Sequence, residues 1–191
     1  MHVSLNNKSV ILLGALVILL IGTAYPIKAA GVKVKSAEIA LLGKDYVLTA
    51  DIDYQLSEEV IEALNNGVSL YWTYHFKIME RRSYLWDKTV VEKAFRYRIQ
   101  YHALLKMYRV RNENNGAVDN FSTLQAALDL LSTLRDYRLI EKAEIDDQKQ
   151  YVAGIKVNFE RDALPLPLRP MAYLNPDWYL SSDWTIWPLK K

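Results

Sequence analysis

The chain of 191 residues contains no cysteine and only seven glycines. Without cysteine, thiol catalysis, iron–sulfur clusters and thiolate zinc sites are excluded. The few glycines do not form a glycine-rich phosphate-binding loop, and no Gly-x-Ser-x-Gly nucleophile motif is present. The sequence therefore gives little support to an enzymatic function, and we expect no cofactor.

Histidines are also scarce, because only His75 and His102 lie beyond residue 31. Both fall on outward faces of expected strands, and side chains opposed on neighbouring strands lie about 4.5–5.5 Å apart at Cβ. Zinc would still need a further ligand, so no metal site is expected. Asp51 and Asp53 share one strand face, and together with either histidine they define a competing hypothesis, an envelope hydrolase.

Net charge of either sign is nearly absent from the main part of the chain. Lys8 and Lys28 are the basic residues of the first 31 positions, so the remaining 22 of the 24 Lys and Arg face all 22 Asp and Glu. A balance near zero removes the whole-domain argument for nucleic-acid binding.

What the sequence does contain is a long uncharged stretch near its start, the 19 residues from Ser9 to Ile27. A secretory signal needs about 7–15 apolar residues, and a spanning helix needs about 17–25. Residues 1–31 are therefore expected to form a hydrophobic helix that is either a cleaved signal peptide or an uncleaved signal anchor. In both cases residues 32–191 are expected to form a single exported domain.

Alternating apolar and polar residues dominate this domain, most clearly from Val68 to Ile78. The same pattern occurs over residues 46–54, 95–101 and 151–159, and more weakly over 37–41, 105–110 and 139–145. Such half-buried strands are typical of antiparallel sheets. We expect an antiparallel β-sandwich of seven or eight strands, with a two-residue hairpin at Gly43-Lys44.

Two short helices are expected between the strands. Ser57 caps the first, and Gly67 lies where it ends. Ser122 and Gln125 form a capping box for the second. The apolar stripe of the second helix is expected to face the core and comprises Leu124, Ala127, Leu128, Leu131 and Leu134.

The C-terminal stretch, residues 163–191, is rich in proline and tryptophan. Its prolines disfavour central strands and helices, so we expect an extended strap over Ala163–Pro170. The strap has two interpretations. It covers an open end of the sandwich with aromatic side chains, or it presents Trp178, Trp184 and Trp187 to a partner or a lipid surface.

A basic stretch suggests a second contact surface. Arg96, Arg98 and His102 alternate outward, and Lys77 and Arg81 extend the same face. The face is either solvated and balanced by nearby acids, or a docking face for an envelope protein partner, an anionic membrane surface or a cell-wall polymer. Export disfavours nucleic acid as the partner.

Several short motifs follow one another in a characteristic order between residues 34 and 188. They include Glu62-Ala63-Leu64, Arg81-Arg82, Trp86-Asp87, Tyr101-His102-Ala103-Leu104, Tyr108-Arg109-Val110, Phe121-Ser122-Thr123-Leu124, Leu164-Pro165-Leu166-Pro167-Leu168-Arg169-Pro170 and Trp178-Tyr179-Leu180-Ser181-Ser182-Asp183-Trp184. In these motifs the chain resembles the domain-of-unknown-function (DUF) 4390 family. The resemblance implies an exported or envelope-located bacterial protein of unknown activity, which places residues 32–191 on the periplasmic side of the cytoplasmic membrane, and it supplies no catalytic residues.

The expected function is accordingly that of a non-catalytic cell-envelope module, which binds or assembles through protein or membrane-surface contacts. The alternatives are an envelope hydrolase and a small-ligand carrier. A carrier would need a sizeable apolar cavity between the sheets.

Overall fold

A computed structural model of the protein describes residues 30–189. The expected N-terminal hydrophobic helix therefore lies outside the described residues, apart from Ala30 and Gly31 at its end. Within residues 30–189, no helix combines the length and the apolar character needed to cross a membrane.

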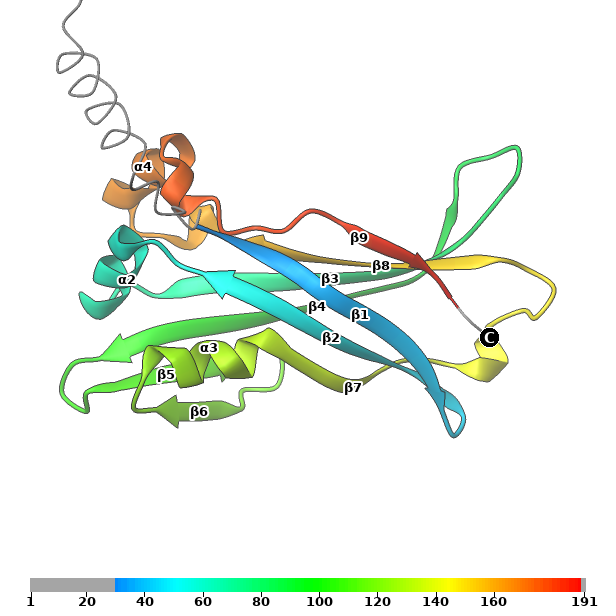
Figure 1. Ribbon diagram of the computed structural model, residues 1–191, viewed down its shortest axis with the longest axis horizontal. Coiled ribbons are helices and arrows are strands. Elements are labelled where there is room, and N and C mark those ends of the chain that lie inside the picture. The colour runs from blue at the N-terminus through cyan, green and yellow to red at the C-terminus, as the bar shows by residue number, and fades with distance from the viewer. Residues whose placement is uncertain (1–29, 190–191) are drawn as a thin grey trace, which may run out of the picture.

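Nine strands of the described chain form two antiparallel sheets (Figure 1). The three-stranded sheet has the order β1-β2-β7 and consists of β1 (Gly31–Leu42), β2 (Asp45–Gln55) and β7 (Thr133–Glu141). The six-stranded sheet has the order β6-β5-β4-β3-β8-β9. Its strands are β3 (Leu70–Glu80), β4 (Lys88–His102), β5 (Met107–Asn112), β6 (Val118–Phe121), β8 (Tyr151–Phe159) and β9 (Thr185–Pro188). The predicted mainly β, antiparallel class is confirmed, but the nine strands of residues 30–189 exceed the seven or eight predicted, and a third short helix joins the two expected ones.

Alternation along the strands places one apolar face of each sheet in a shared core. The inward side chains of β3 are all fully buried: Leu70, Trp72, Tyr74, Phe76 and Ile78. Inward residues of β2 and β8 join the same buried cluster, including Leu48, Ile52, Ile155 and Val157. Because the polar residues between them remain on the outside, each sheet has one face in the core and one face toward water.

A buried chain of hydroxyl groups links the two sheets to a helix. The Tyr54 hydroxyl on β2 is hydrogen-bonded to the Tyr74 hydroxyl on β3. Tyr74 in turn donates to the Leu131 carbonyl oxygen of α3 (Leu124–Ser132) at 2.8 Å, so Tyr54 is the donor between the two tyrosines. Burial raises the pKa of both phenols, and each remains a neutral hydrogen-bonding group.

Both expected helices are present. Helix α2 (Glu58–Asn65) begins after Ser57, whose hydroxyl accepts from the Val60 amide at 3.3 Å, and Gly67 follows its end with φ of +88°. The cap predicted for the second helix is wrong, because Thr123 rather than Ser122 caps α3 and accepts from the Ala126 amide. The hairpin prediction is confirmed: Leu42 pairs with Asp45, and Gly43 between them has φ of +63°.

The C-terminal segment differs from the expected extended strap. It folds into 3₁₀ turns at Arg161–Ala163, Leu166–Leu168 and Pro176–Trp178 and into a short helix, α4 (Arg169–Leu174). Pro170 lies in the first turn of α4, where the missing N–H is not needed and the fixed φ suits a helix. The remainder of the segment reaches the six-stranded sheet and adds β9 at its edge.

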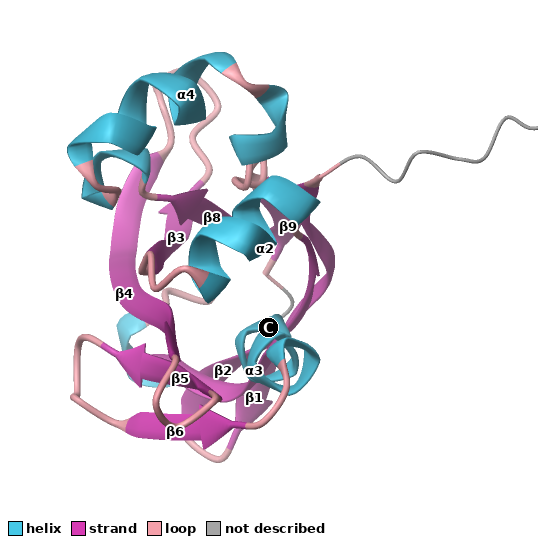
Figure 2. Cartoon of the chain, turned by 90° about the vertical axis from the view of Figure 1, so that its left-hand side faces the viewer, coloured by secondary structure: helices cyan, strands magenta, loops and turns pink. Residues whose placement is uncertain are grey.

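The same segment closes one end of the core (Figure 2). The Trp178 ring is 1% exposed and packs 6.3 Å, centroid to centroid, from Phe159. The Trp72 indole donates to the Leu180 carbonyl oxygen at 3.0 Å. The segment that closes this end of the core is thus more than 100 positions away from Trp72 in sequence.

Candidate functional site

The outer face of the six-stranded sheet collects most of the predicted basic residues. Lys77 lies on β3, and Arg96, Arg98 and His102 lie on β4. The register pairs Thr73 with Arg96 and Tyr71 with Arg98, so the outward side chains of the two strands form one continuous surface. The predicted outward placement on these strands is confirmed, although Arg81 lies beyond the end of β3, and a role of this face in binding stays a prediction.

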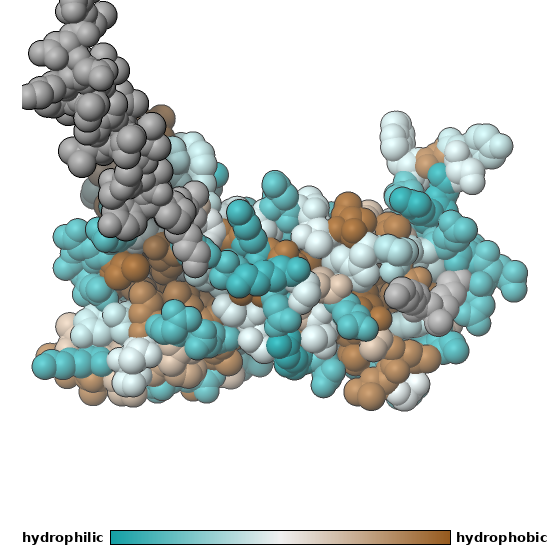
Figure 3. Space-filling view, viewed as in Figure 1, coloured by the Kyte–Doolittle hydropathy of each residue, from teal (hydrophilic) through white to brown (hydrophobic). Residues whose placement is uncertain are grey.

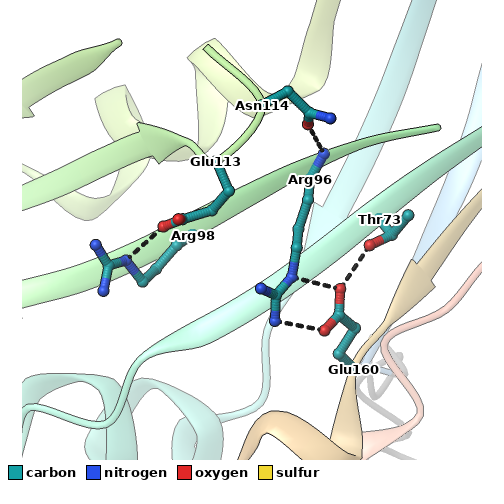
Figure 4. Close-up of polar contacts among 6 residues, drawn as sticks. All are labelled: Thr73, Arg96, Arg98, Glu113, Asn114 and Glu160. Atoms are coloured by element: carbon teal, nitrogen blue, oxygen red, sulfur yellow. Dashed lines mark hydrogen bonds and ion pairs between the residues drawn. The ribbon is translucent and has the colours of Figure 1, made fainter. Parts of the chain in front are cut away.

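Arg96 is held on this face by a network of hydrogen bonds to neighbouring residues (Figure 4). Its Nε and Nη2 donate to the two carboxylate oxygens of Glu160 at 2.8 and 2.7 Å. The Thr73 hydroxyl donates to the same carboxylate at 2.5 Å, and the Asn114 side chain accepts from the Arg96 amide. The guanidinium also lies over the Tyr71 ring, 4.3 Å from its centroid.

Glu160 is held ionised by these donors. Burial by itself would raise the pKa of the carboxyl, but the hydrogen bonds from Arg96 and Thr73 outweigh it and hold the pKa below its ordinary value. The positive charge of Arg96 is therefore compensated over the whole neutral range.

Arg98 is compensated in the same way. Its Nε lies 2.9 Å from Oε1 of Glu113 (Figure 4). Arg111 approaches the other oxygen of that carboxylate at 3.8 Å. Farther along β3, Lys77 pairs with Glu92 at 3.1 Å. Of the two interpretations of the basic face, these contacts support a solvated surface balanced by its own acids.

The predicted tryptophans do not form one surface. Trp184 is 38% exposed on the outer face, where it lies against Gly154: a Cβ at Gly154 would be 3.3 Å from the Trp184 ring. Its ring also faces the Lys77 ammonium at 5.4 Å. Trp187 is partly buried against the core, and Trp178 is a core residue. Trp178 as a contact residue is therefore a wrong prediction, because its ring fills the end of the core and its indole N–H donates to Glu59 at 3.1 Å.

The hydrolase hypothesis required Asp51 or Asp53 to converge with a histidine. Both aspartates lie on β2 of the three-stranded sheet, where Asp51 pairs with Arg135 at 2.5 Å and Asp53 pairs with Lys35 at 3.2 Å. The histidines lie on the other sheet, so the four groups do not converge.

The two histidines do not meet each other either. His75 pairs across the ladder with Ala94, which is eight residues from His102 on the same strand, or roughly 26 Å. Within residues 30–189, no group of three or more His, Asp or Glu is placed to hold a metal ion.

The β3–β4 loop carries the most exposed aromatic side chains of the described chain, and the sequence reasoning did not select them. Tyr84 is 97% exposed, Leu85 69% and Trp86 94%. This loop stands away from the body of the molecule in Figures 1 and 3. We call Tyr84, Leu85 and Trp86 the loop tip. The available signal was a run of three large apolar residues between two strands, where turn residues are normally polar.

The base of this loop carries charges of both signs. Arg82 and Lys149 both pair with Glu80, at 3.7 and 3.2 Å, and the Arg82 amide donates to Asp87. The adjoining surface recess of about 680 Å³ is lined by polar and charged side chains, Arg81 among them. Such a lining does not suit the apolar ligand of a carrier protein.

Comparisons with known proteins agree with the motif order. No curated protein and no solved structure matches the chain. The family model described as "Domain of unknown function (DUF4390)" matches residues 29–188, which is most of the chain. The protein belongs to the DUF4390 family.

Proposed function

We propose that this protein is a non-catalytic binding module of the cell envelope, built on a β-sandwich scaffold and engaging a protein partner through its loop tip. The observation that carries the proposal is the exposure of Tyr84 and Trp86, at 97% and 94%. Trp and Tyr dominate the energetic centres of protein interfaces, whereas folding alone gives no reason to hold both rings in water.

The acidic side chains beside the loop tip favour a protein over an anionic membrane as its partner. A membrane-binding tip is usually surrounded by uncompensated Lys and Arg. Here two acids lie among the cations, because Arg82 and Lys149 share Glu80 and Asp87 lies directly beside the tip, while Arg81 and Lys88 leave an excess of positive charge. An apolar pocket with a polar rim on a partner protein fits this pattern better than an acidic lipid surface.

Delivery to the envelope is part of the same proposal. The uncharged stretch from Ser9 to Ile27 supports export, with the hydrophobic helix acting as a signal peptide or as an anchor. On this view, the domain works on the periplasmic side of the cytoplasmic membrane. The paired state of Arg96 and Arg98 makes the outer sheet face a scaffold surface, so we assign the binding role to the loop tip.

The proposal is tested by replacing the loop tip in the tagged full chain. Tyr84→Ser/Trp86→Ser should remove a defined partner from quantitative copurification. The matched control is Leu104→Ser/Leu105→Ser in the β4–β5 turn, whose side chains are 101% and 59% exposed. Retention of the same partner by the Tyr84→Ser/Trp86→Ser chain would contradict the proposal.

A further inference from the structure

The end of the molecule at which the described chain begins has an exposed apolar surface of its own. Gly31 pairs with Gln55, and a Cβ at Gly31 would lie 3.9 Å from the Tyr179 carbonyl oxygen. The chain thus enters beside the C-terminal helical turns. Figures 1 and 2 show α2 and α4 at this same end.

The short link between the uncharged stretch Ser9–Ile27 and Gly31 limits how far this end can lie from a bilayer. The uncharged stretch ends at Ile27, four residues before Gly31. Four residues span at most about 14 Å, and the headgroup layer of each leaflet is roughly 5–7 Å deep. If the stretch stays in the membrane, which is the anchor form of the proposed function, Gly31 is held within about 7–9 Å of the headgroup layer.

Large apolar side chains are exposed at this end. Leu166 is 72% exposed, Met171 47% and Leu174 81%. Met171 and Leu174 lie three residues apart on α4 and therefore share one side of the helix. Exposing such side chains to water is unfavourable. At a membrane surface they can instead be buried at the boundary between headgroups and acyl chains.

Two tyrosines and an arginine accompany these residues. The Arg161 guanidinium lies 4.7 Å from the Tyr173 ring centroid and 5.2 Å from that of Tyr179, and both rings are about half exposed. Within residues 30–189, Arg161 forms no ion pair. Tyrosine favours the water–lipid boundary, and a guanidinium suits phosphate oxygens. Because Asp162 and Asp177 belong to the same end, apolar contact rather than net charge would carry the attachment.

We propose that Leu166, Met171, Leu174, Tyr173 and Tyr179 form a membrane-docking surface. This surface binds the phospholipid headgroups of the same bilayer that holds the uncharged stretch Ser9–Ile27. The docked domain is then oriented, with the α4 end against the headgroups. The β1–β2 hairpin lies at the far end of β1, eleven residues or roughly 36 Å from Gly31.

The chain has no cysteine, so single cysteines can carry a fluorescent label at chosen positions. The experiment uses the full chain in vesicles of phosphatidylcholine and phosphatidylglycerol that contain a nitroxide-bearing lipid. The label is placed by Leu174→Cys or, as the control, by Leu42→Cys, because Leu42 is exposed on the β1–β2 hairpin. We expect strong quenching at position 174 and none at position 42.

A further variant separates docking from simple proximity. Leu166→Ser/Met171→Ser in the chain labelled at position 174 should shift the docked-to-undocked ratio by about tenfold or more toward the undocked form. Equal quenching at positions 174 and 42, or quenching at 174 that this variant leaves unchanged, would overturn the docking surface. Either result would leave the proposed binding role of the loop tip standing, whereas a chain that fails to float with the vesicles would overturn docking together with the anchor.

Discussion

The Arg96 guanidinium grips the Glu160 carboxylate through two hydrogen bonds of 2.8 and 2.7 Å. Arg96 comes from the middle of β4, and Glu160 directly follows β8, so the pair bridges across β3 on the outer face of the sheet. Arg96 was a candidate docking residue in the sequence, but its pairing with Glu160 gives it a structural role. It also makes the pair's contribution to stability measurable.

Arg96→Gln should lower the free energy of unfolding by about 1 kcal/mol, because it breaks a partly exposed bidentate pair and leaves Glu160 with fewer donors. A double-mutant cycle with Glu160→Gln, followed by urea denaturation, measures the coupling. The control is Arg109→Gln, since Arg109 bonds the neutral Asn120, and its cost should stay within about 0.5 kcal/mol. A coupling of zero between Arg96 and Glu160 would contradict the prediction by showing that the pair contributes no net stability.

Acidification should destabilise the fold in an upper step governed by His75. Burial lowers the pKa of this imidazole below 6.5, and Lys156 and Lys77 lower it further, against Glu92 and Glu160. The unfolded chain then binds a proton that the folded chain does not, so stability is present above about pH 6.5 and falls as the pH drops through the folded pKa. Urea midpoints across this range should decline for the natural chain and decline less for His75→Gln.

A lower acid step belongs to Glu160. Its folded pKa lies below the ordinary 4.5, because the donors Arg96 and Thr73 outweigh the effect of burial. The pair's stabilisation is complete above about pH 4.5 and is lost as the pH falls through the folded pKa. Titration of the Glu160 side chain by NMR should give a depressed pKa that rises in Arg96→Gln. An ordinary pKa in the natural chain would contradict the network.

The tyrosine pair predicts an order of effects on stability. Tyr74→Phe removes a hydroxyl that both accepts from Tyr54 and donates to the Leu131 carbonyl, so two buried groups lose a partner and the cost should be about 1–3 kcal/mol. Tyr54→Phe removes only the outer donor and should cost less. Thermal or urea unfolding of the two variants checks the order, and the reverse order would mean that the chain of hydroxyls runs differently.

Trp178 and Trp184 should differ sharply on truncation. Trp178→Ala opens a cavity in the core and should cost about 3–5 kcal/mol, or prevent folding. Trp184→Ala removes a ring from the outer face beside Gly154 and should cost much less. Because Trp178→Ala can fail to fold, Trp178→Phe serves as the intermediate variant, with a loss smaller than that of the alanine. Equal costs for Trp178→Phe and Trp184→Phe would contradict the core assignment of Trp178.

How far the fold follows from the sequence depends on how local the signal is. Strand β3 was predictable because its apolar residues alternate without interruption, and α2 because Ser57 and Gly67 mark its two ends. Strand β6 carries no such pattern: Val118, Asp119 and Asn120 are all exposed, and pairing with β5 alone makes this segment a strand. Strand β9 was hidden by Pro188, which is tolerated because it ends an edge strand.

The basic face likewise has one feature that the local sequence predicts and one that depends on the complete fold. Alternation correctly placed Arg96 and Arg98 on one outward face, but the partner acids Glu160 and Glu113 come from loops whose positions depend on the complete sheet. Sequence spacing therefore identified the two arginines but not the two acids that neutralise them. Trp178 was misassigned for a related reason, since a proline-rich segment gives no periodicity from which to read an inward or outward direction.

The central claim is that the loop tip is where this protein binds its partner. The most direct measurement places a photoreactive amino acid at Leu85, or at the control position Leu104, in the full chain and irradiates intact cells. Both side chains are largely exposed, so access to solvent does not distinguish them. We predict a discrete protein adduct from position 85 that Tyr84→Ser/Trp86→Ser abolishes, and none from position 104. An adduct from both positions alike, or none from position 85, would contradict the claim.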